Sequence, residues 1–102
     1  MMKALVVLSS VTLCTFSAQA NPELAKRNLC MSCHDVDKKQ IGPAFKDVAA
    51  RYANQKDAAA AKLADKIMHG GSGAWGAVPM PANPKVTPEE ARQLANWVLT
   101  LK

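Results

Sequence analysis

The residues with the clearest chemical potential lie in the stretch "CMSCH", from Cys30 to His34. Two thiols and an imidazole follow one another in the order Cys-x-x-Cys-His. Such a set can hold a metal ion, exchange disulfides or carry a covalently bound haem. The surrounding elements decide which of these three chemistries is favoured.

Disulfide exchange at a Cys-x-x-Cys pair requires a mixed scaffold of strands and helices, and we find no convincing strand pattern. A structural zinc site needs four ligands, and Cys30, Cys33, His34 and His69 have a spacing that fits no usual zinc pattern. Haem attachment is therefore favoured. Two thiols on one helical turn can form thioethers to the former vinyl groups, and the imidazole that follows can face the iron.

The N-terminus has the features of a secretory signal peptide. Lys3 is followed by a mostly apolar run from Ala4 to Cys14, and Ala18-Gln19-Ala20 has the form of a cleavage site. The apolar run is shorter than the roughly 20 residues that a membrane-spanning helix needs. We therefore predict a cleaved signal at residues 1–20, one domain at residues 21–102 and no stable insertion into the membrane.

Cleavage after Ala20 changes both the cysteine count and the charge. Removing 20 residues from a chain of 102 leaves 82, takes away Cys14 and lowers the net charge from +5 to +4. A domain of this size has a small core and often needs a bound cofactor for stability. Its modest and scattered charge suits acidic protein partners and does not indicate nucleic-acid binding.

Helix signals occupy most of the mature chain. "PELAKRNLC" is expected to form a short helix before the motif, and "PAFKDVAARYA" has apolar residues at helical spacing. "DAAAAKLADKIMHGG" is rich in alanine and should end at Gly70-Gly71. Before the last helix, Thr87 and Glu90 form a capping-box pattern around Pro88. An apolar stripe follows at Leu94, Trp97, Val98 and Leu101.

Between the third and fourth helices lies a long loop rich in glycine and proline, which indicates a functional segment. Within it, "VPMPANP" places Met80 between Pro79 and Pro81. Methionine is often a core filler, but flanking prolines fix the backbone and reduce the entropy lost when a thioether is presented. A thioether and an imidazole together form an axial pair that raises the reduction potential of a haem.

The stretches "CMSCH", "IGPAFKDVAARYA", "HGGSGAWGAVPMPAN" and "ARQLANWVLTLK" together resemble the small bacterial class I c-type cytochromes, most closely the c-551 type. The resemblance implies an all-α fold of four short helices and a long loop wrapped round one covalently bound haem c. It implies thioethers at Cys30 and Cys33, with His34 and Met80 as axial iron ligands. It also implies one-electron transport in the periplasm, not enzyme activity.

The same resemblance suggests roles for three residues around the cofactor. The Pro43 carbonyl would accept a hydrogen bond from His34, the Trp75 indole would reach a haem propionate, and Asn83 would donate towards the Met80 sulfur. The alternatives are a helix-start proline, a core aromatic and a turn residue. His69 is expected at the surface, and Met68 in the core.

From these observations we expect a soluble, monomeric electron carrier of the periplasm. Its redox protein partners are expected to be acidic at the docking surface. Two alternatives stay open, a ligand-binding or sensing haem module and a haem enzyme with a displaceable sixth ligand. A set of lysines could surround an exposed haem edge and steer acidic partners, or could simply be solvated: Lys26, Lys38, Lys39, Lys46 and Lys85.

Overall fold

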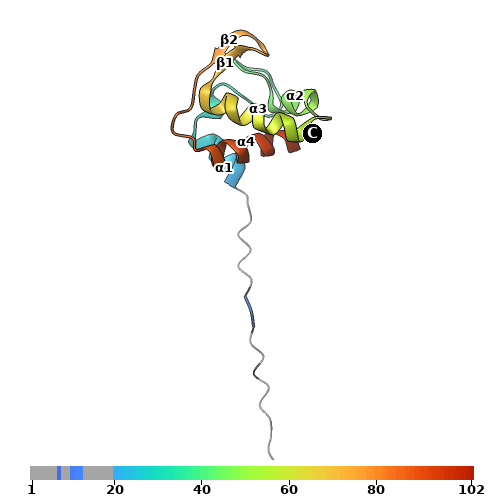
Figure 1. Ribbon diagram of the computed structural model, residues 1–102, viewed down its shortest axis with the longest axis vertical. Helices are drawn as coiled ribbons and strands as arrows, with labels where there is room; N and C mark the ends of the chain where they lie inside the picture. The colour runs from blue at the N-terminus through green and yellow to red at the C-terminus, as the bar shows by residue number, and fades with distance from the viewer. Residues whose placement is uncertain (1–6, 8–9, 13–19) are drawn as a thin grey trace, which may run out of the picture.

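The structure is a computed structural model that describes residues 7, 10–12 and 20–102 (Figure 1). Its elements follow in the order α1 (Ala20–Arg27), the 3-10 turn η1 (Cys30–Ser32), α2 (Phe45–Arg51), α3 (Lys56–His69), β1 (Gly71–Gly73), β2 (Gly76–Met80) and α4 (Pro88–Thr100). Within the described part of the chain, no helix is long and apolar enough to cross a membrane. Most of the predicted signal peptide, residues 1–6, 8–9 and 13–19, lies outside the described residues.

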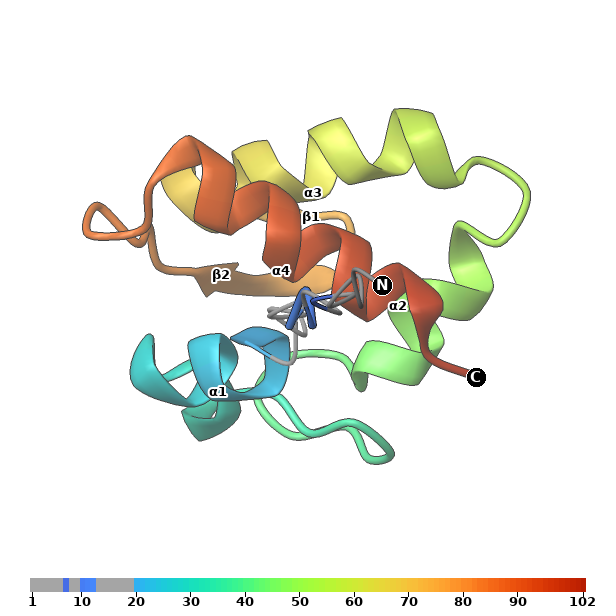
Figure 2. The same ribbon diagram turned by 90° about the horizontal axis from the view of Figure 1, so that it is seen from below.

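Helices α3 and α4 form the centre of the fold, and α3 packs chiefly against α4 (Figures 1 and 2). Helix α1 lies against α4 on one side of this pair, and the β1–β2 ribbon lies on the other side. The buried residues of α3 are the alanines Ala59, Ala60 and Ala64, and α4 buries Ala91 and Ala95 among its larger residues. Small side chains let two helices approach closely, so the alanine-rich sequence of α3 has a packing role.

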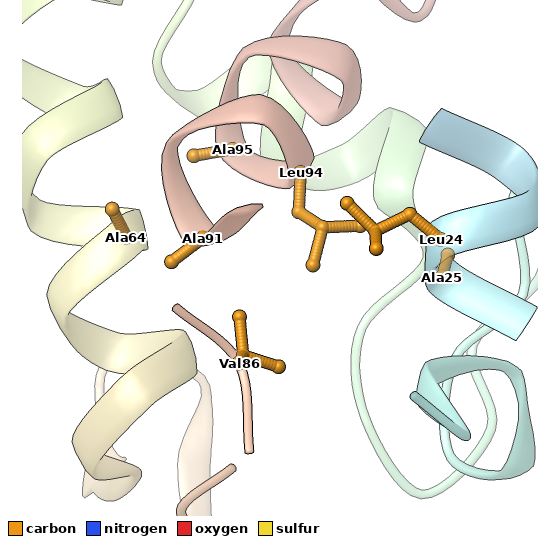
Figure 3. Close-up of a cluster of buried hydrophobic side chains, with 7 residues drawn as sticks. All are labelled: Leu24, Ala25, Ala64, Val86, Ala91, Leu94 and Ala95. Carbon is orange, nitrogen blue, oxygen red and sulfur yellow. The ribbon is translucent and has the colours of Figure 1, made fainter. Parts of the chain in front are cut away.

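The main core cluster joins α1, α3 and α4 (Figure 3). Leu24 is nearly fully buried, and in Figure 3 its side chain lies against that of Leu94 from the facing helix. A second cluster joins α2 to α4. The cluster residues are Leu24, Ala25, Ala64, Val86, Ala91, Leu94 and Ala95 in the first, and Phe45, Val48 and Val98 in the second.

The predicted helix signals are largely confirmed. The capping box at Thr87 and Glu90 is present, with Pro88 as the first residue of α4. Helix α3 ends at Gly70, which has φ 72°. Helix α1 is shorter at its C-terminus than the predicted stretch, because Leu29 takes a left-handed conformation, φ 59°, and turns the chain into η1.

The glycine-rich loop differs from the expectation that no strand would be present. Strands β1 and β2 pair antiparallel within it, with Gly71 opposite Met80 and Gly73 opposite Gly76. Strand β1 is Gly-Ser-Gly and β2 is Gly-Ala-Val-Pro-Met, so apolar and polar side chains do not alternate along either strand. A ribbon of this kind lacks the alternating pattern by which strands are recognised in a sequence.

Candidate haem-binding site

The Cys-x-x-Cys-His motif forms one tight turn in the structure. The backbone N–H groups of Cys33 and His34 both donate to the Cys30 carbonyl oxygen, at 3.2 and 3.0 Å. Cys30 and Cys33 are half-buried free thiols. Burial raises the pKa of the Cys30 thiol, because the apolar surroundings disfavour the thiolate. The turn therefore presents both thiols and the imidazole from five consecutive residues.

The imidazole of His34 is held by three neighbours. Its Nδ1–H donates to the Pro43 carbonyl oxygen at 2.8 Å, and the Phe45 ring stacks on it with centroids 4.8 Å apart. Gly42 lies so close that a Cβ there would come within 2.5 Å of the His34 Cε1 atom. Because Nδ1 carries the proton, Nε2 retains its lone pair, which is the form of imidazole that binds a metal.

The backbone around the motif explains why Pro43 meets His34. The Gly42 N–H donates to the Cys33 carbonyl oxygen at 2.8 Å, and the Phe45 N–H donates to the Asp35 carbonyl oxygen at 2.9 Å. These bonds fold the segment between η1 and α2 back on the motif. The Asp35 carboxylate accepts from the N–H groups of Asp37 and Lys38, which lowers the pKa of Asp35.

A cavity of about 740 Å³ opens beside this segment. Most of the predicted site residues contribute to its lining: Cys33, His34, Pro43, Trp75 and Met80. Cys30 lines a smaller adjacent cavity of about 40 Å³, together with His34 and Met80. The fold thus brings both thiols, the imidazole and the thioether to one connected region.

The residues that line the larger cavity fit a haem. Its volume lies in the usual range for bound cofactors and ligands, and side chains from α2, α3, α4 and the ribbon make it mostly apolar. An imidazole nitrogen and a thioether sulfur form the donor pair known from cytochromes c, and two thiols lie beside them. Lys39, Lys62 and Lys66 supply positive charge that suits carboxylates on the ligand.

The comparisons with known proteins decide the family. The family model described as "Cytochrome c" matches residues 19–102. This chain belongs to the cytochrome c family. Cytochrome c-552 of Nitrosomonas europaea is 55% identical over 85 residues, which are 83% of this chain and 82% of that protein. Cytochrome c-551 of Pseudomonas aeruginosa is 44% identical over 106 residues, which cover 99% of this chain and 100% of that protein.

Solved structures give the same result. The crystal structure of wild-type Nitrosomonas europaea cytochrome c552 has a TM-score of 0.75 and 53% identity, and it covers 79% of this chain and 99% of that one. The class 1 cytochrome MtoD from Sideroxydans lithotrophicus has a TM-score of 0.70 and 35% identity, covering 83% and 96%. The predicted class I cytochrome c fold is confirmed.

Membership in this family assigns the cofactor and the general role. The cytochrome carries one covalently bound haem c. Its relatives are electron-carrier cytochromes, not enzymes, so this cytochrome is an electron carrier that exchanges electrons with redox proteins.

Asn83 also contacts the end of α3. Its side-chain Nδ2 donates to the Ile67 carbonyl oxygen at 2.9 Å. The amide has a second hydrogen, and its donation towards the Met80 sulfur stays a prediction. The backbone N–H of Asn83 is shared between the Ile67 and Met68 carbonyl oxygens. The last carbonyls of a helix lack partners within the helix, and the half-buried end of α3 takes Asn83 as a donor.

Sequence reasoning missed several polar residues around the cytochrome's cavity. Lys62 and Lys66 line it from α3, and their i, i+4 spacing beside Leu63 and Ile67 could have revealed one shared helix face. Among the lysines predicted to surround the site, Lys39 lines the cavity. Two others form ion pairs, Lys26 with Glu23 at 3.9 Å and Lys46 with Asp37 at 2.5 Å.

Arg51 was also missed, although it contacts Trp75. Its guanidinium carbon lies 3.4 Å from the centroid of the Trp75 ring, and Nη1 donates to the Ala74 carbonyl oxygen at 2.6 Å. The contact joins the end of α2 to the turn of the β1–β2 ribbon. Trp75 itself is half-buried and lines the cavity, as a residue close to the cofactor should.

The remaining candidates lie away from the cavity. His69 is exposed and pairs with Asp65, with Nδ1 and Oδ1 2.9 Å apart. Met68 packs against the main core cluster. In residues 7, 10–12 and 20–102, no group of three or more His, Cys, Asp or Glu side chains is arranged to hold a metal ion.

Proposed function

We propose that this cytochrome is a soluble periplasmic electron carrier whose haem is attached at Cys30 and Cys33 and ligated by His34 and Met80. The observation that carries this proposal is that the imidazole and the thioether line the same two cavities, and that each cavity also contains one of the two thiols. The bound haem supplies a reversible one-electron change at its iron.

The chain's own residues keep the proposed ligands in place through that change. The Pro43 carbonyl oxygen accepts the hydrogen bond from His34 Nδ1, which leaves Nε2 free and makes the imidazole a stronger electron-pair donor to a metal. Phe45 and Gly42 prevent the ring from rotating. His34 and Met80 would hold the cofactor from both sides of the cavity, so little rearrangement of the chain would accompany electron transfer.

The proposed site for electron exchange is the exposed mouth of the cavity. Ile41 and Val78 contribute to the cavity lining, and we propose that a partner approaches the cofactor beside them. Lys39, Lys62 and Lys66 line the same cavity. We propose that these lysines, more than the ion-paired Lys26 and Lys46, attract an acidic partner.

The proposed periplasmic location depends on export by the predicted signal peptide. The signal-like residues 1–20 precede a motif whose thiols need to be attached to haem. If both belong to one assembly route, a chain expressed without residues 1–20 should lack covalent haem and should fold poorly. A compact, cooperatively melting chain without haem would contradict this expectation.

Carbon monoxide tests the carrier against a ligand-binding or sensing module. The reduced wild-type protein should show no spectral change when carbon monoxide is added, because Met80 occupies the sixth position. Met80→Ala should bind carbon monoxide. A wild-type protein that binds carbon monoxide readily would favour the ligand-binding alternative.

A further inference from the structure

Gly70 lies where the end of α3 meets the backbone of the Met80 segment. It is the C-cap residue of α3, with φ 72° and ψ −165°. This backbone conformation is available essentially to glycine alone. Its N–H donates to the Lys66 carbonyl oxygen at 2.7 Å, so the residue still belongs to the last turn of the helix.

The space beside Gly70 is filled by the backbone that follows β2. A Cβ on Gly70 would lie 2.7 Å from the Ala82 nitrogen and 2.9 Å from the Pro81 carbonyl carbon, and closer still to the Met80 carbonyl oxygen. All three atoms belong to the main chain, so no side-chain rotation can make room. Any residue with a Cβ would have to push the Met80 segment away from α3.

Two further contacts fix the same segment on either side of Gly70. Gly71, the first residue of β1, pairs with Met80 in the ribbon. After the Met80 segment, Asn83 donates to the Ile67 and Met68 carbonyl oxygens. Gly70 lies between these two contacts along the end of α3, so it determines how near the Met80 backbone comes to the helix.

We propose that Gly70 is a positioning residue for Met80. Its missing side chain lets the Met80 backbone lie directly on the C-terminal turn of α3, and this close approach determines how far the thioether reaches into the cavity. The inference rests on the proposed ligation of iron by Met80. It adds that position 70 must lack a Cβ, which neither the Cys-x-x-Cys-His motif nor the prolines around Met80 indicate.

His69 provides a control at the same end of α3. Its side chain is exposed, pairs with Asp65 and does not line the cavity. His69→Ala therefore changes the last turn of the helix without adding an atom beside the Met80 segment.

The test uses the haem-bound full chain and records the near-infrared sulfur-to-iron band of the oxidised protein, with the far-UV helix signal measured alongside. Gly70→Ala should lose most of the band and bind carbon monoxide when reduced, while its helix signal is retained. His69→Ala should keep the band. A Gly70→Ala protein with the wild-type band, or an equal loss in both variants, would overturn the proposal.

If Met80 is not the iron ligand, the variants give a different pattern of bands. If Met80→Ala keeps the band, Met80 is not the ligand, and the role of Gly70 falls with it. If Met80→Ala loses the band and Gly70→Ala keeps it, only the Gly70 proposal is overturned.

A second comparison applies if Gly70→Ala does not accumulate with haem. Pro81→Gly loosens the segment that the new Cβ would strike, because glycine relaxes the backbone that proline restrains. The double variant Gly70→Ala/Pro81→Gly should then accumulate with haem and show a weaker band than Pro81→Gly alone. Equal bands in these two proteins would overturn the proposal.

Discussion

At the scale of single residues, the structure restrains His34 more fully than any other side chain of the site. A hydrogen bond, a stacked ring and a glycine contact act on three parts of one imidazole. Each contact alone is worth little, but together they permit one ring orientation. If His34 ligates the iron as proposed, this restraint would keep the imidazole in place when the iron changes its charge.

Gly42→Ala tests this restraint. The added methyl group would overlap the imidazole, so the ring must tilt and the bond to Pro43 must lengthen. We expect a loss of about 1–3 kcal/mol in the free energy of unfolding, as for other overpacked sites. The ferric spectrum and the reduction potential should change with it.

Pro43→Ala is the matched control for Gly42→Ala. It keeps the backbone carbonyl that accepts the His34 proton, so the spectrum should change much less. Equal spectral changes in the two variants would argue that Gly42 has no particular relation to the imidazole.

Arg51→Lys tests the contact with Trp75. Lysine keeps the charge but loses the planar group that lies over the ring and donates to Ala74. We expect a loss of about 0.5–1 kcal/mol in unfolding free energy, typical of an exposed cation–π pair. Amide exchange at Ala74 should accelerate, whereas Arg92→Lys, on the exposed face of α4, should change neither quantity. Unchanged exchange at Ala74 would show that the contact does not order the ribbon.

Site residues that lie close together in the sequence were easier to predict than contacts between residues far apart. Cys30, Cys33 and His34 lie within five consecutive residues, so their spacing in the sequence was enough to predict their chemistry. The pairing of His34 with Pro43 was expected from the family resemblance, and the hydrogen bond is present. Arg51 contacts Ala74, which lies 23 positions further along the chain in the turn of the ribbon, and no local sequence pattern predicts such a contact.

At the scale of elements, local signals predicted the helix ends where a side chain or a glycine determines them. Helix α4 begins at its capping box, and α3 ends at a glycine with positive φ. The ribbon was missed because its stability comes from backbone pairing at exposed glycines. The contact of Asn83 with the Ile67 carbonyl was not predicted, because the need of the α3 carbonyls for a donor appears only once α3 is placed beside the Met80 segment.

Thr87→Ala tests the contribution of the capping box to α4. The Thr87 hydroxyl accepts from the Glu90 N–H at 3.1 Å, and its removal leaves that donor without its partner. We expect a loss of about 0.5–2 kcal/mol, measured by denaturant unfolding of the haem-bound protein. Thr100→Ala is the control, because the Thr100 hydroxyl bonds only to the Trp97 carbonyl at the other end of α4. A loss no larger than that of Thr100→Ala would contradict the capping role.

At the scale of the whole molecule, the cavity is assembled from segments that are distant in the sequence. The motif turn, α3, α4 and the ribbon each contribute lining residues. Periodicity predicted most of these elements singly, whereas their arrangement round a single haem came from the resemblance to known cytochromes. Lys39 was among the lysines predicted to lie near the cofactor, whereas Lys62 and Lys66 were assigned to the cavity only after α3 had been placed against it.

Lys62→Glu tests whether charge at the cavity guides partners. Lys62 lines the cavity, whereas Lys56 lies at the start of the same helix and does not. With an acidic redox partner at low salt, Lys62→Glu should slow association more than Lys56→Glu does. The difference should shrink as the Debye length falls from about 30 Å at 0.01 M to about 10 Å at 0.1 M salt. Equal rates for the two variants at low salt would contradict steering by the cavity lysines.

The central claim is that Met80, and no other methionine, completes the coordination of iron. The sulfur-to-iron band of the oxidised protein tests it most directly. Met80→Ala should abolish the band and lower the reduction potential, because a thioether favours ferrous iron. Met68→Leu should keep the band and cost at most about 1.5 kcal/mol, as volume-conserving core substitutions do. A band that survives Met80→Ala and disappears in Met68→Leu would contradict the account.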